Sequence, residues 1–241
     1  MKIKCDFSLR HYQEILDLFK ERGYKFCFFS EAPDKKTKKV YLRHDIDYSP
    51  ETALRLAQIE YQKKIHSTYF IRLSAPFYNI FESKNAKIIK KIINLGHQIG
   101  LHFEINLSKK TIEREITNQI KVIQLYFDIE KIVSFHRPPK YILNQKFKNF
   151  ISSYEAKFFK EIKYLSDSCG HESLWKEGCV CQWLKSQSCP RDLQILIHPI
   201  WWGRKEKDPN KYLHQYLKGK VKYLDNSLAK NLKIYKKKFL S

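Results

Sequence analysis

The sequence predicts an α/β fold built on a parallel sheet, either open or closed into a barrel. Two textures alternate along the chain: short apolar runs rich in β-branched and aromatic residues, and amphipathic segments with helical periodicity between several of them. Strand–helix–strand alternation of this kind is typical of parallel sheets that are covered by helices. The chain of 241 residues is long enough for one such domain with a substantial core.

Six short runs are predicted as the strands of this sheet. They cover residues 40–47, 66–73, 97–104, 131–139, 162–168 and 193–202. We expect a single domain over residues 1–241, divided into three parts. The parts are an N-terminal helical segment over 1–39, the strands and chemical motifs over 40–203, and a basic helical tail over 204–241.

Four amphipathic segments are predicted as helices. They cover residues 8–22, 49–64, 85–96 and 108–127. The second begins with Ser49 as N-cap and Pro50 at the first helical position, and the third ends at Gly96, which suits a C-cap. The last carries four isoleucines on one stripe. The tail over 230–241 alternates lysine with apolar residues and is predicted as a terminal helix, either solvated or docked on an anionic membrane or polyanion.

The composition is that of a folded and strongly basic protein. Apolar residues make up 43% and aromatic residues 15% of the chain, which argues against intrinsic disorder. The 46 Lys and Arg against 25 Asp and Glu give a net charge of +21, which favours anionic partners such as a glycan precursor or a membrane surface. The sequence has no zinc-finger, RRM or KH signature and its lysines are dispersed, so we expect no nucleic-acid partner.

The six cysteines are interpreted together with the expected compartment. The sequence shows neither a secretory signal nor an apolar run of ~18 residues, so we expect a cytoplasmic protein with mostly reduced thiols. The inner face of the membrane is a candidate for peripheral contact. Four of the cysteines and His171 fall between residues 169 and 189. Cys179 and Cys181 lack the CxxC spacing and no second pair follows, so free thiols are favoured over a structural zinc site.

The carboxyl ends of the predicted strands share a chemical feature, because ionisable or aromatic side chains gather there in five clusters. The clusters are His44, Asp45 and Asp47; His102 and Glu104; His136 and Arg137; Asp167; and His198 and Trp201. In a parallel barrel these strand ends converge on the face that carries active sites. Carboxylate and imidazole suit a divalent ion such as zinc, and the remaining groups supply a base and an acid. Together the clusters indicate metal-assisted hydrolysis.

Each cluster also has a structural explanation when it is taken alone. A carboxylate before residue 50 can cap the following helix, His102 can be a satisfied core histidine, and Arg137 can make an ion pair in a rigid turn. Asp167 can likewise cap a helix. The order and placement of all five clusters are therefore more informative than any one of them.

With these motifs the sequence resembles the polysaccharide deacetylases of carbohydrate esterase family 4, the NodB-homology type. The matching motifs are RHDID at 43–47, GHQIGLHFEIN at 96–106, HRPP at 136–139, Asp167, and LIH at 196–198. The resemblance extends from residue 7 to residue 203 and is greatest to a cytoplasmic branch linked to surface-polysaccharide synthesis. It implies a distorted (β/α) barrel of about seven parallel strands and one divalent metal, zinc foremost, with cobalt or nickel as alternatives.

The resemblance also implies a role for each matching residue. The roles are Asp45 as catalytic base, Asp47 and His102 as metal ligands, Arg137 as the partner that tunes the base, Asp167 as a pocket residue that can hold the catalytic histidine, and His198 as general acid. Leu196 lines the pocket for the acetyl group, and Pro138 lies with it at the substrate site. Trp201 and Trp202 offer flat faces for sugar rings, but in a strand one of them points inward, so we expect one platform, Trp201.

One position departs from the family pattern. The second metal-ligand histidine of the family corresponds to Asn106, which is a poor zinc ligand. Three explanations are open: Glu104 shares a strand face with His102 and can replace it, His136 can approach from the neighbouring strand, or the site binds metal weakly or not at all. We prefer His136 over Glu104, and we expect His97 to be structural.

The expected function is removal of an acetyl group from an amino sugar. In the cytoplasm the substrate would be a nucleotide-linked or lipid-linked precursor rather than a finished polymer, and both are anionic. The alternative is a catalytically degenerate relative that binds sugar or organises glycan assembly, and Asn106 is the reason for considering it. The sequence leaves the oligomeric state open.

Overall fold

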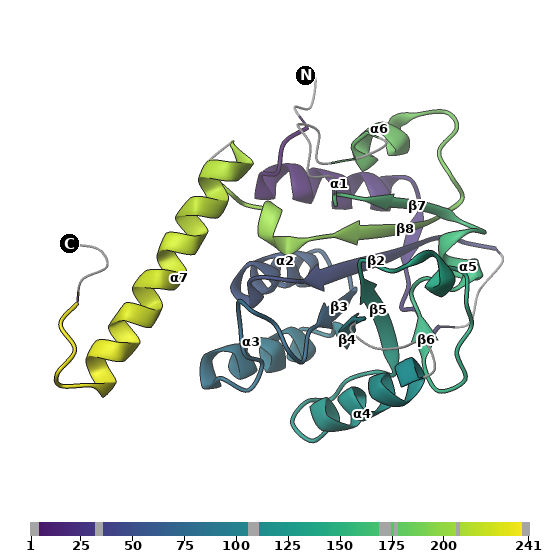
Figure 1. The fold of residues 1–241 in the computed structure, drawn as a ribbon. Coiled ribbons are helices and arrows are strands. Elements are labelled where there is room, and N and C mark those ends of the chain that lie inside the picture. Colours follow the sequence, from purple (N-terminus) through teal and green to yellow (C-terminus); the bar gives the residue numbers. More distant parts are fainter. Residues whose placement is uncertain are drawn as a thin grey trace. The chain divides into compact units, whose positions relative to one another are not determined.

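A computed structural model describes residues 5–31, 36–105, 111–168, 175, 178–205 and 208–237 of the chain. The chain forms two compact units, Met1–Trp202 and Gly203–Ser241. The first unit contains a sheet with helices packed around it, and the second is dominated by one long helix (Figure 1). None of the helices in the described ranges is long and apolar enough to cross a bilayer.

The sheet consists of parallel strands with helical connections. In chain order the strands are β1 (Tyr24–Phe26), β2 (Lys38–Ile46), β3 (Thr68–Ile71), β4 (Gln98–Glu104), β5 (Ile132–His136), β6 (Ile151–Ser152), β7 (Lys163–Ser166) and β8 (Asp192–Ile197). Seven of them follow the order β6-β5-β4-β3-β2-β8-β7, and β1 pairs with the start of β2. The sheet curls into an open, distorted (β/α) barrel, which confirms the predicted fold class.

Strand β2 lies at the centre of the sheet and determines which side chains enter its concave side. It pairs with β3 on one side and with β8 on the other, and every residue from Lys39 to Ile46 is buried. Because successive side chains alternate between faces, Arg43 and Asp45 point to one side and His44 and Ile46 to the other. The first pair reaches the barrel interior, and His44 contacts the helices that cover the outside.

The interior of the barrel is closely packed where β3, β4 and β5 meet. A Cβ placed on Gly100 of β4 would lie 2.7 Å from the carbonyl oxygen of Ile132 and 2.7 Å from the ring of Phe70. Glycine is therefore required at this position, and it lets β4 bring the following residues close to β5.

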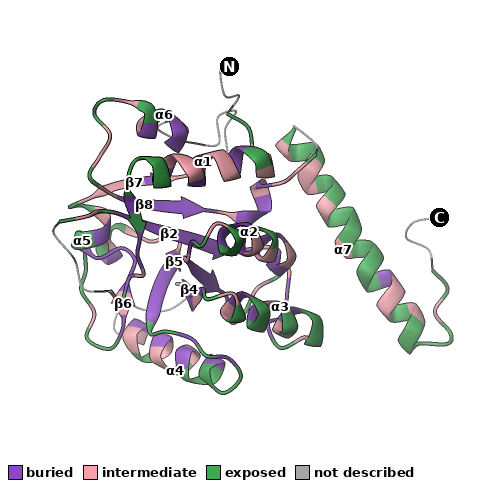
Figure 2. Ribbon diagram, turned by 180° about the vertical axis from the view of Figure 1, so that it is seen from behind, coloured by how far each residue is buried: buried purple, intermediate pink, exposed green. Residues whose placement is uncertain are grey.

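Helices cover the outer face of the sheet. They are α1 (Leu9–Glu21), α2 (Pro50–Gln62), α3 (Ser83–Asn94), α4 (Ile112–Gln124), α5 (Ala156–Phe159) and α6 (Val180–Lys185), all in the first unit. The second unit contains α7 (Pro209–Asn231). Figure 2 shows the central strands β2, β4, β5 and β8 largely buried, whereas β7 is mostly intermediate and the helices of the first unit combine buried with exposed residues. One apolar cluster includes side chains of α2, α3 and α4, and a second includes side chains of α1 and α6.

The predicted elements agree with the structure in most of the sheet. All six predicted strands and the helices over 8–22, 49–64, 85–96 and 108–127 are present with shifted ends, and residues 108–110 lie outside the described ranges. The last predicted strand is shorter than expected, because β8 ends at Ile197 and Pro199–Trp201 form a 3₁₀ turn. Proline cannot donate to a strand ladder, which explains the early end of β8.

The helical tail predicted over 204–241 contains helix α7, but the terminal helix predicted over 230–241 is absent from its described part beyond Asn231. Helix α7 ends at Asn231, and Leu232 has extended backbone angles, so residues 232–237 do not continue the helix predicted over 230–241. Lys233, Lys236 and Lys237 would place like charges three and four residues apart on a helix, which is unfavourable. The chain instead turns, and the Tyr235 hydroxyl donates to Asp225 Oδ1 at 2.6 Å.

Candidate active site

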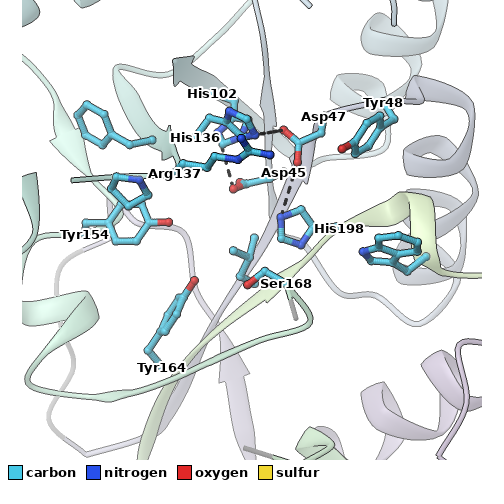
Figure 3. A pocket seen from close by; sticks show the side chains of 14 residues that line it. Asp45, Asp47, Tyr48, His102, His136, Arg137, Tyr154, Tyr164, Ser168 and His198 are labelled. Atoms are coloured by element: carbon cyan, nitrogen blue, oxygen red, sulfur yellow. Dashed lines mark ion pairs between the residues drawn. The ribbon is translucent and has the colours of Figure 1, made fainter. Parts of the chain in front are cut away.

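The carboxyl ends of the strands surround one pocket of about 290 Å³ (Figure 3). Nine of the ten predicted site residues line it: Asp45, Asp47, His102, His136, Arg137, Pro138, Leu196, His198 and Trp201. The tenth, Asp167, lies behind His198 and is fully buried. Residues from β2, β4, β5 and β8 are thus brought together as expected for the carboxyl edge of a parallel sheet.

Asp45 is a buried carboxylate held by an arginine on its own strand. Arg43 donates from Nε to Asp45 Oδ1 at 2.9 Å and from Nη2 to Oδ2 at 2.7 Å. Burial alone would raise the pKa of Asp45, but the Arg43 guanidinium and then His102 outweigh it and hold that pKa well below its usual range. Asp45 is therefore ionised and fixed in orientation.

The predicted partner of Asp45 needs correction, because the arginine that binds it is Arg43 and not Arg137. Arg43 lies two residues before Asp45, so both side chains emerge on the same face of β2. Arg137 lines the pocket with a backbone φ of 50°, a left-handed conformation that is uncommon for a bulky residue. Such conformations concentrate at functional sites, so Arg137 keeps a place at the pocket without the role first given to it.

His102 is oriented by a short hydrogen-bond relay that ends on Asp45. Its Nδ1 lies 2.7 Å from Ser134 Oγ, and the Ser134 hydroxyl donates to Asp45 Oδ1 at 3.2 Å. Because the Ser134 hydroxyl donates its proton to Asp45, Ser134 Oγ acts as acceptor for the proton on His102 Nδ1. This tautomer leaves the lone pair of His102 on Nε2, which faces the pocket.

Asp47 lies opposite the lone pair of His102. Asp47 Oδ1 is 3.0 Å from His102 Nε2, yet among the described residues neither buried atom has a hydrogen-bond partner. Burial would raise the pKa of Asp47, but its interaction with the His102 ring, followed by the charge of His198, lowers that pKa overall. Two buried lone pairs that face each other without a proton between them are the arrangement expected of metal ligands.

His136 approaches the same point from the neighbouring strand. Its Nε2 lies 3.8 Å from Asp47 Oδ1, and its Nδ1 lies 3.3 Å from Glu104 Oε1. Glu104 is also ion-paired to Arg72, so its carboxylate is held beside His136 Nδ1 and can orient this ring. Burial lowers the pKa of His136, which favours the neutral, metal-binding form of the ring.

These three side chains fit a divalent ion. Ligand atoms arranged tetrahedrally at zinc–nitrogen and zinc–oxygen bond lengths lie about 3.3 Å apart, and the contacts on Asp47 Oδ1 are 3.0 and 3.8 Å. Two imidazoles and one carboxylate match the donor set of catalytic zinc sites, which keep a further position open for substrate. His136 thus lies within reach of the same point as His102 and Asp47, while Asn106 lies outside the described residues.

His198 faces the metal-ligand group from the other side of the pocket. Its Nδ1 lies 2.6 Å from Asp167 Oδ1, its backbone N–H also donates to Asp167, and its Nε2 lies 3.7 Å from Asp47 Oδ2. Burial alone would lower the pKa of His198, but the charge and hydrogen bond of Asp167, followed by Asp47 and Asp45, raise it to about 9. The ring is therefore poised to carry a proton on Nε2.

Asp167 is held by a tryptophan behind the pocket. Trp202 is buried and donates from Nε1 to Asp167 Oδ2 at 2.9 Å. Trp201 is half-buried and lines the pocket, so the two tryptophans divide as expected, although they lie in a turn rather than a strand. Leu196 is buried beneath His198 and offers an apolar floor.

Several residues of the site were not identified from the sequence. Arg43 and Ser134 could have been found, because each lies two residues before a predicted site residue on the same strand face. Tyr154 and Tyr164 also line the pocket, and Arg43 Nη2 donates to the Tyr154 hydroxyl at 3.0 Å. Tyr154 follows the two-residue strand β6, which has no recognisable pattern.

Two histidines near these motifs belong to the scaffold. His44 Nε2 lies 2.8 Å from Glu60 Oε1 of α2, on the side of β2 away from the pocket. His97 Nε2 lies 3.0 Å from the carbonyl oxygen of Ala57, and its Nδ1 lies 3.1 Å from Ser67 Oγ. His97 is thus structural, as expected, and His44 joins the sheet to its covering helices.

The sequence matches no family model and no curated protein. In structure, the chain is similar to a family 4 carbohydrate esterase from Bacillus anthracis, with 16% identity, a TM-score of 0.37 and coverage of 86% of this chain and 85% of that one. A chitin deacetylase from the fungal pathogen Colletotrichum lindemuthianum gives 14% identity, a TM-score of 0.44 and coverage of 80% and 88%. A family 4 acetyl xylan esterase from Clostridium thermocellum in complex with a cobalt ion gives 20% identity and a TM-score of 0.39, with coverage of 73% of this chain and 80% of that one.

Proposed function

We propose that the protein is a metal-dependent hydrolase that removes an acetyl or similar small acyl group from an amino sugar. The observation that carries the proposal is the pair of buried, facing lone pairs on Asp47 Oδ1 and His102 Nε2, with His136 directed at the same point. A carboxylate and an imidazole that can exchange protons lie on either side of that point. Binding, proton acceptance and proton donation are thus assigned to different residues of one pocket.

The three ligands would hold one divalent ion, zinc foremost, with cobalt or nickel as alternatives. When bound, such an ion acts as a Lewis acid that polarises a carbonyl and makes water more acidic. Asp47 supplies the negative charge, and His102 and His136 supply neutral nitrogen donors. The relay through Ser134 and the contact with Glu104 fix the two rings, so little freedom is lost when an ion binds.

Asp45 is assigned as the base and His198 as the acid. Asp45 accepts the proton of the attacking water, and Arg43 keeps it ionised and in place, although the same ion pair reduces its basicity. His198 donates a proton from Nε2 to the leaving nitrogen, while Asp167 on Nδ1 stabilises the charged ring. The proton taken from water therefore goes to Asp45, and the proton given to the leaving nitrogen comes from His198 on the other side of the pocket.

The substrate is assigned from the walls of the pocket. Trp201 offers a flat apolar face of the kind on which sugar rings stack, and Leu196 offers an apolar floor for a methyl group. Pro138 and the backbone of Arg137 form a rigid rim. We assign a nucleotide-linked or lipid-linked amino sugar as the substrate, because the net charge of +21 attracts anionic molecules.

The cytoplasmic face of a membrane is the location that suits such a substrate. Helix α7 carries Leu217, Val221, Leu224 and Leu228, which fall on one stripe at spacings of four, three and four residues. Five lysines occupy other positions of the same helix. Basic amphipathic helices of this kind bind anionic lipid surfaces. We expect the protein to sediment with vesicles containing phosphatidylglycerol and not with neutral vesicles, and Leu224→Glu to weaken this binding.

Acetate release from acetylated sugars tests the proposed reaction. We expect the metal-depleted protein to regain activity on adding zinc, with a UDP-linked N-acetylated amino sugar and a chitin oligosaccharide as first substrates. Asp47→Ala should abolish both zinc activation and turnover, whereas His198→Ala should lose turnover and retain zinc. Sugar binding without turnover in the zinc-loaded protein would overturn the hydrolase assignment and favour the degenerate, sugar-binding alternative.

A further inference from the structure

A second group of metal-binding side chains lies on the outer side of the sheet, away from the pocket. It comprises Cys5, His11, Cys179 and Cys181, and we call it the Cys3His cluster. One ligand atom from each of the four residues lies within 4.8 Å of all the others. Three segments that are distant in sequence supply them: the N-terminal segment, the first turn of α1, and the start of α6, which Figures 1 and 2 show beside α1.

The distances within the Cys3His cluster are those of a closed coordination site. Cys5 Sγ and Cys181 Sγ are 3.3 Å apart, and His11 Nε2 and Cys179 Sγ are also 3.3 Å apart. Sulfur atoms bound tetrahedrally to one zinc ion at about 2.3 Å lie about 3.8 Å apart, and a sulfur and a nitrogen slightly less. The separations within the cluster extend up to 4.8 Å, so shifts of about 1 Å or less would seat an ion among the four atoms.

Burial and side-chain support also match a metal site. His11, Cys179 and Cys181 are each at most 4% exposed, and only Cys5 reaches the surface. Glu14 Oε2 lies 3.4 Å from His11 Nδ1, so a carboxylate orients the ring and leaves Nε2 directed at Cys179. A carboxylate on the far nitrogen of a histidine is a recurrent feature of zinc-ligating histidines.

The backbone holds three of the four ligands in place. Ser8 caps α1 by accepting the His11 N–H at 3.1 Å, which fixes the first turn of that helix. Cys179 is the N-cap of α6 and Cys181 lies in its first turn, so both thiols are held by one short element. A disulfide would join two of the three sulfurs and leave a thiol and an imidazole buried beside it, whereas a metal ion uses all four groups.

We propose that Cys5, His11, Cys179 and Cys181 bind a structural zinc ion that joins the N-terminal segment to the start of α6. The sequence favours free thiols here, because Cys179 and Cys181 are not spaced as a CxxC pair and no second pair follows. The structure adds Cys5 and His11, which lie more than 160 residues away in sequence. Cys169 and His171, the other members of the sequence cluster, lie outside the described residues. Cys189 contacts the Tyr24 hydroxyl instead.

The Cys3His cluster touches the wall that supports the proposed acid. The His11 ring stacks on Trp202 with 6.4 Å between centroids, and Phe7, two residues after Cys5, packs edge-on against Trp202 at 4.9 Å. Trp202 in turn donates to Asp167. The zinc ion therefore anchors the N-terminal segment over this tryptophan, and its chief effect is on stability, since the four ligands are all used by the protein and none faces the pocket.

Cobalt substitution tests this site without any assay of activity. We expect protein loaded with cobalt chloride to show a sulfur-to-cobalt charge-transfer band, which the oxygen and nitrogen donors of the pocket cannot produce. The band should persist in Asp47→Ala and in the matched control Cys189→Ser, and it should vanish in a Cys5→Ser, Cys181→Ser double variant. No such band in the wild-type protein, or an undiminished band in the double variant, would overturn the proposal.

Thiol mapping in the wild-type protein covers the case in which the double variant does not fold. After purification under reducing conditions, alkylation at Cys5, Cys179 and Cys181 should be slow with zinc bound and fast after chelation, while Cys189 reacts equally in both states. Chelation should also lower Tm by about 5 °C or more. A Cys5–Cys181 disulfide, or the same alkylation pattern with and without chelator, would contradict a zinc site.

Discussion

Arg43 shows how much of the pocket depends on a single residue to which the sequence assigns no role. Its guanidinium is fully buried and binds both oxygens of Asp45, so each charge is neutralised by the other. Removing one partner of a buried pair leaves an uncompensated charge and costs about 3–5 kcal/mol. Lysine would not replace it, because a single ammonium cannot make the two parallel hydrogen bonds.

A double-mutant cycle between Arg43 and Asp45 tests this ion pair. We expect Arg43→Met and Asp45→Asn to show a coupling of about 3 kcal/mol in the free energy of unfolding measured with urea. Arg137→Met serves as the matched control, and its coupling to Asp45→Asn should stay below about 0.5 kcal/mol. Coupling of Asp45 to Arg137 instead of Arg43 would restore the partner that the sequence suggested.

Variants of His136 and Glu104 distinguish the effect of losing a metal ligand from the effect of losing the residue that orients it. We expect His136→Ala to abolish or severely weaken zinc activation of acetate release, because it removes a donor atom. Glu104→Gln should weaken zinc binding by about 10–100-fold, since it leaves all three donor atoms in place and removes only the negative charge that orients His136 and pairs with Arg72. Zinc titration of the metal-depleted variants measures both effects, and equal losses in the two variants would speak against this division of roles.

Among the elements, Glu60 joins helices α1 and α2 to the sheet. Its carboxylate is fully buried and accepts hydrogen bonds from the hydroxyls of Tyr12, Ser67 and Tyr69, and it lies 2.8 Å from His44 Nε2. Burial alone would raise the pKa of Glu60, but His44 and its other partners lower it from 4.5 to about 2. The folded protein therefore binds fewer protons at this group than the unfolded chain does.

Stability of Glu60→Gln as a function of pH tests this junction. A lowered pKa stabilises the fold above the unfolded value of 4.5, and the contribution is lost as pH falls toward 2. We expect Glu60→Gln to cost about 3 kcal/mol at pH 7 and progressively less below pH 4.5, when wild type and variant are compared by urea unfolding. A cost that does not change between pH 7 and pH 3 would show that the charge of Glu60 is not what stabilises this junction.

The elements differ in how far their sequences predict them. The strands of a parallel sheet are buried on both faces, so β2, β4 and β8 read as apolar runs and were predicted. The strands β1 and β6 have three and two residues, which is too short for any pattern. Helix α7 lies within the helical tail predicted over 204–241, but lysine alternating with apolar residues also predicts helix beyond Asn231, where the described chain has none.

At the scale of the whole molecule, the sequence predicts which residues lie close together where they follow a regular strand pattern. It does not predict contacts between distant segments that no such pattern relates. Parallel strands have their carboxyl ends at the same edge of the sheet, and this general property brings Asp47, His102, His136 and His198 together. No comparable rule joins Cys5 and His11 to Cys179, which approach each other only through packing of α1 against α6. The pocket was therefore largely predictable, and the Cys3His cluster was not.

The charge of the whole molecule is expected to act on association more than on chemistry. A net charge of +21 attracts anionic substrates over a distance set by the salt concentration. For an anionic substrate we expect kcat/KM to fall as salt rises from low to physiological ionic strength, with kcat unchanged. A neutral acetylated sugar is the control, and an equal salt effect on both substrates would show that attraction of the substrate is not the cause.

Zinc content measured in wild type and Asp47→Ala tests the central claim most directly. Both proteins would be purified without chelator, saturated with zinc, freed of excess ion and analysed by elemental mass spectrometry beside the surface variant Asp17→Ala. The account predicts that Asp47→Ala contains about one zinc fewer per chain than wild type, and that Asp17→Ala matches wild type. Equal zinc content in all three proteins would contradict a metal site at the carboxyl ends of the strands.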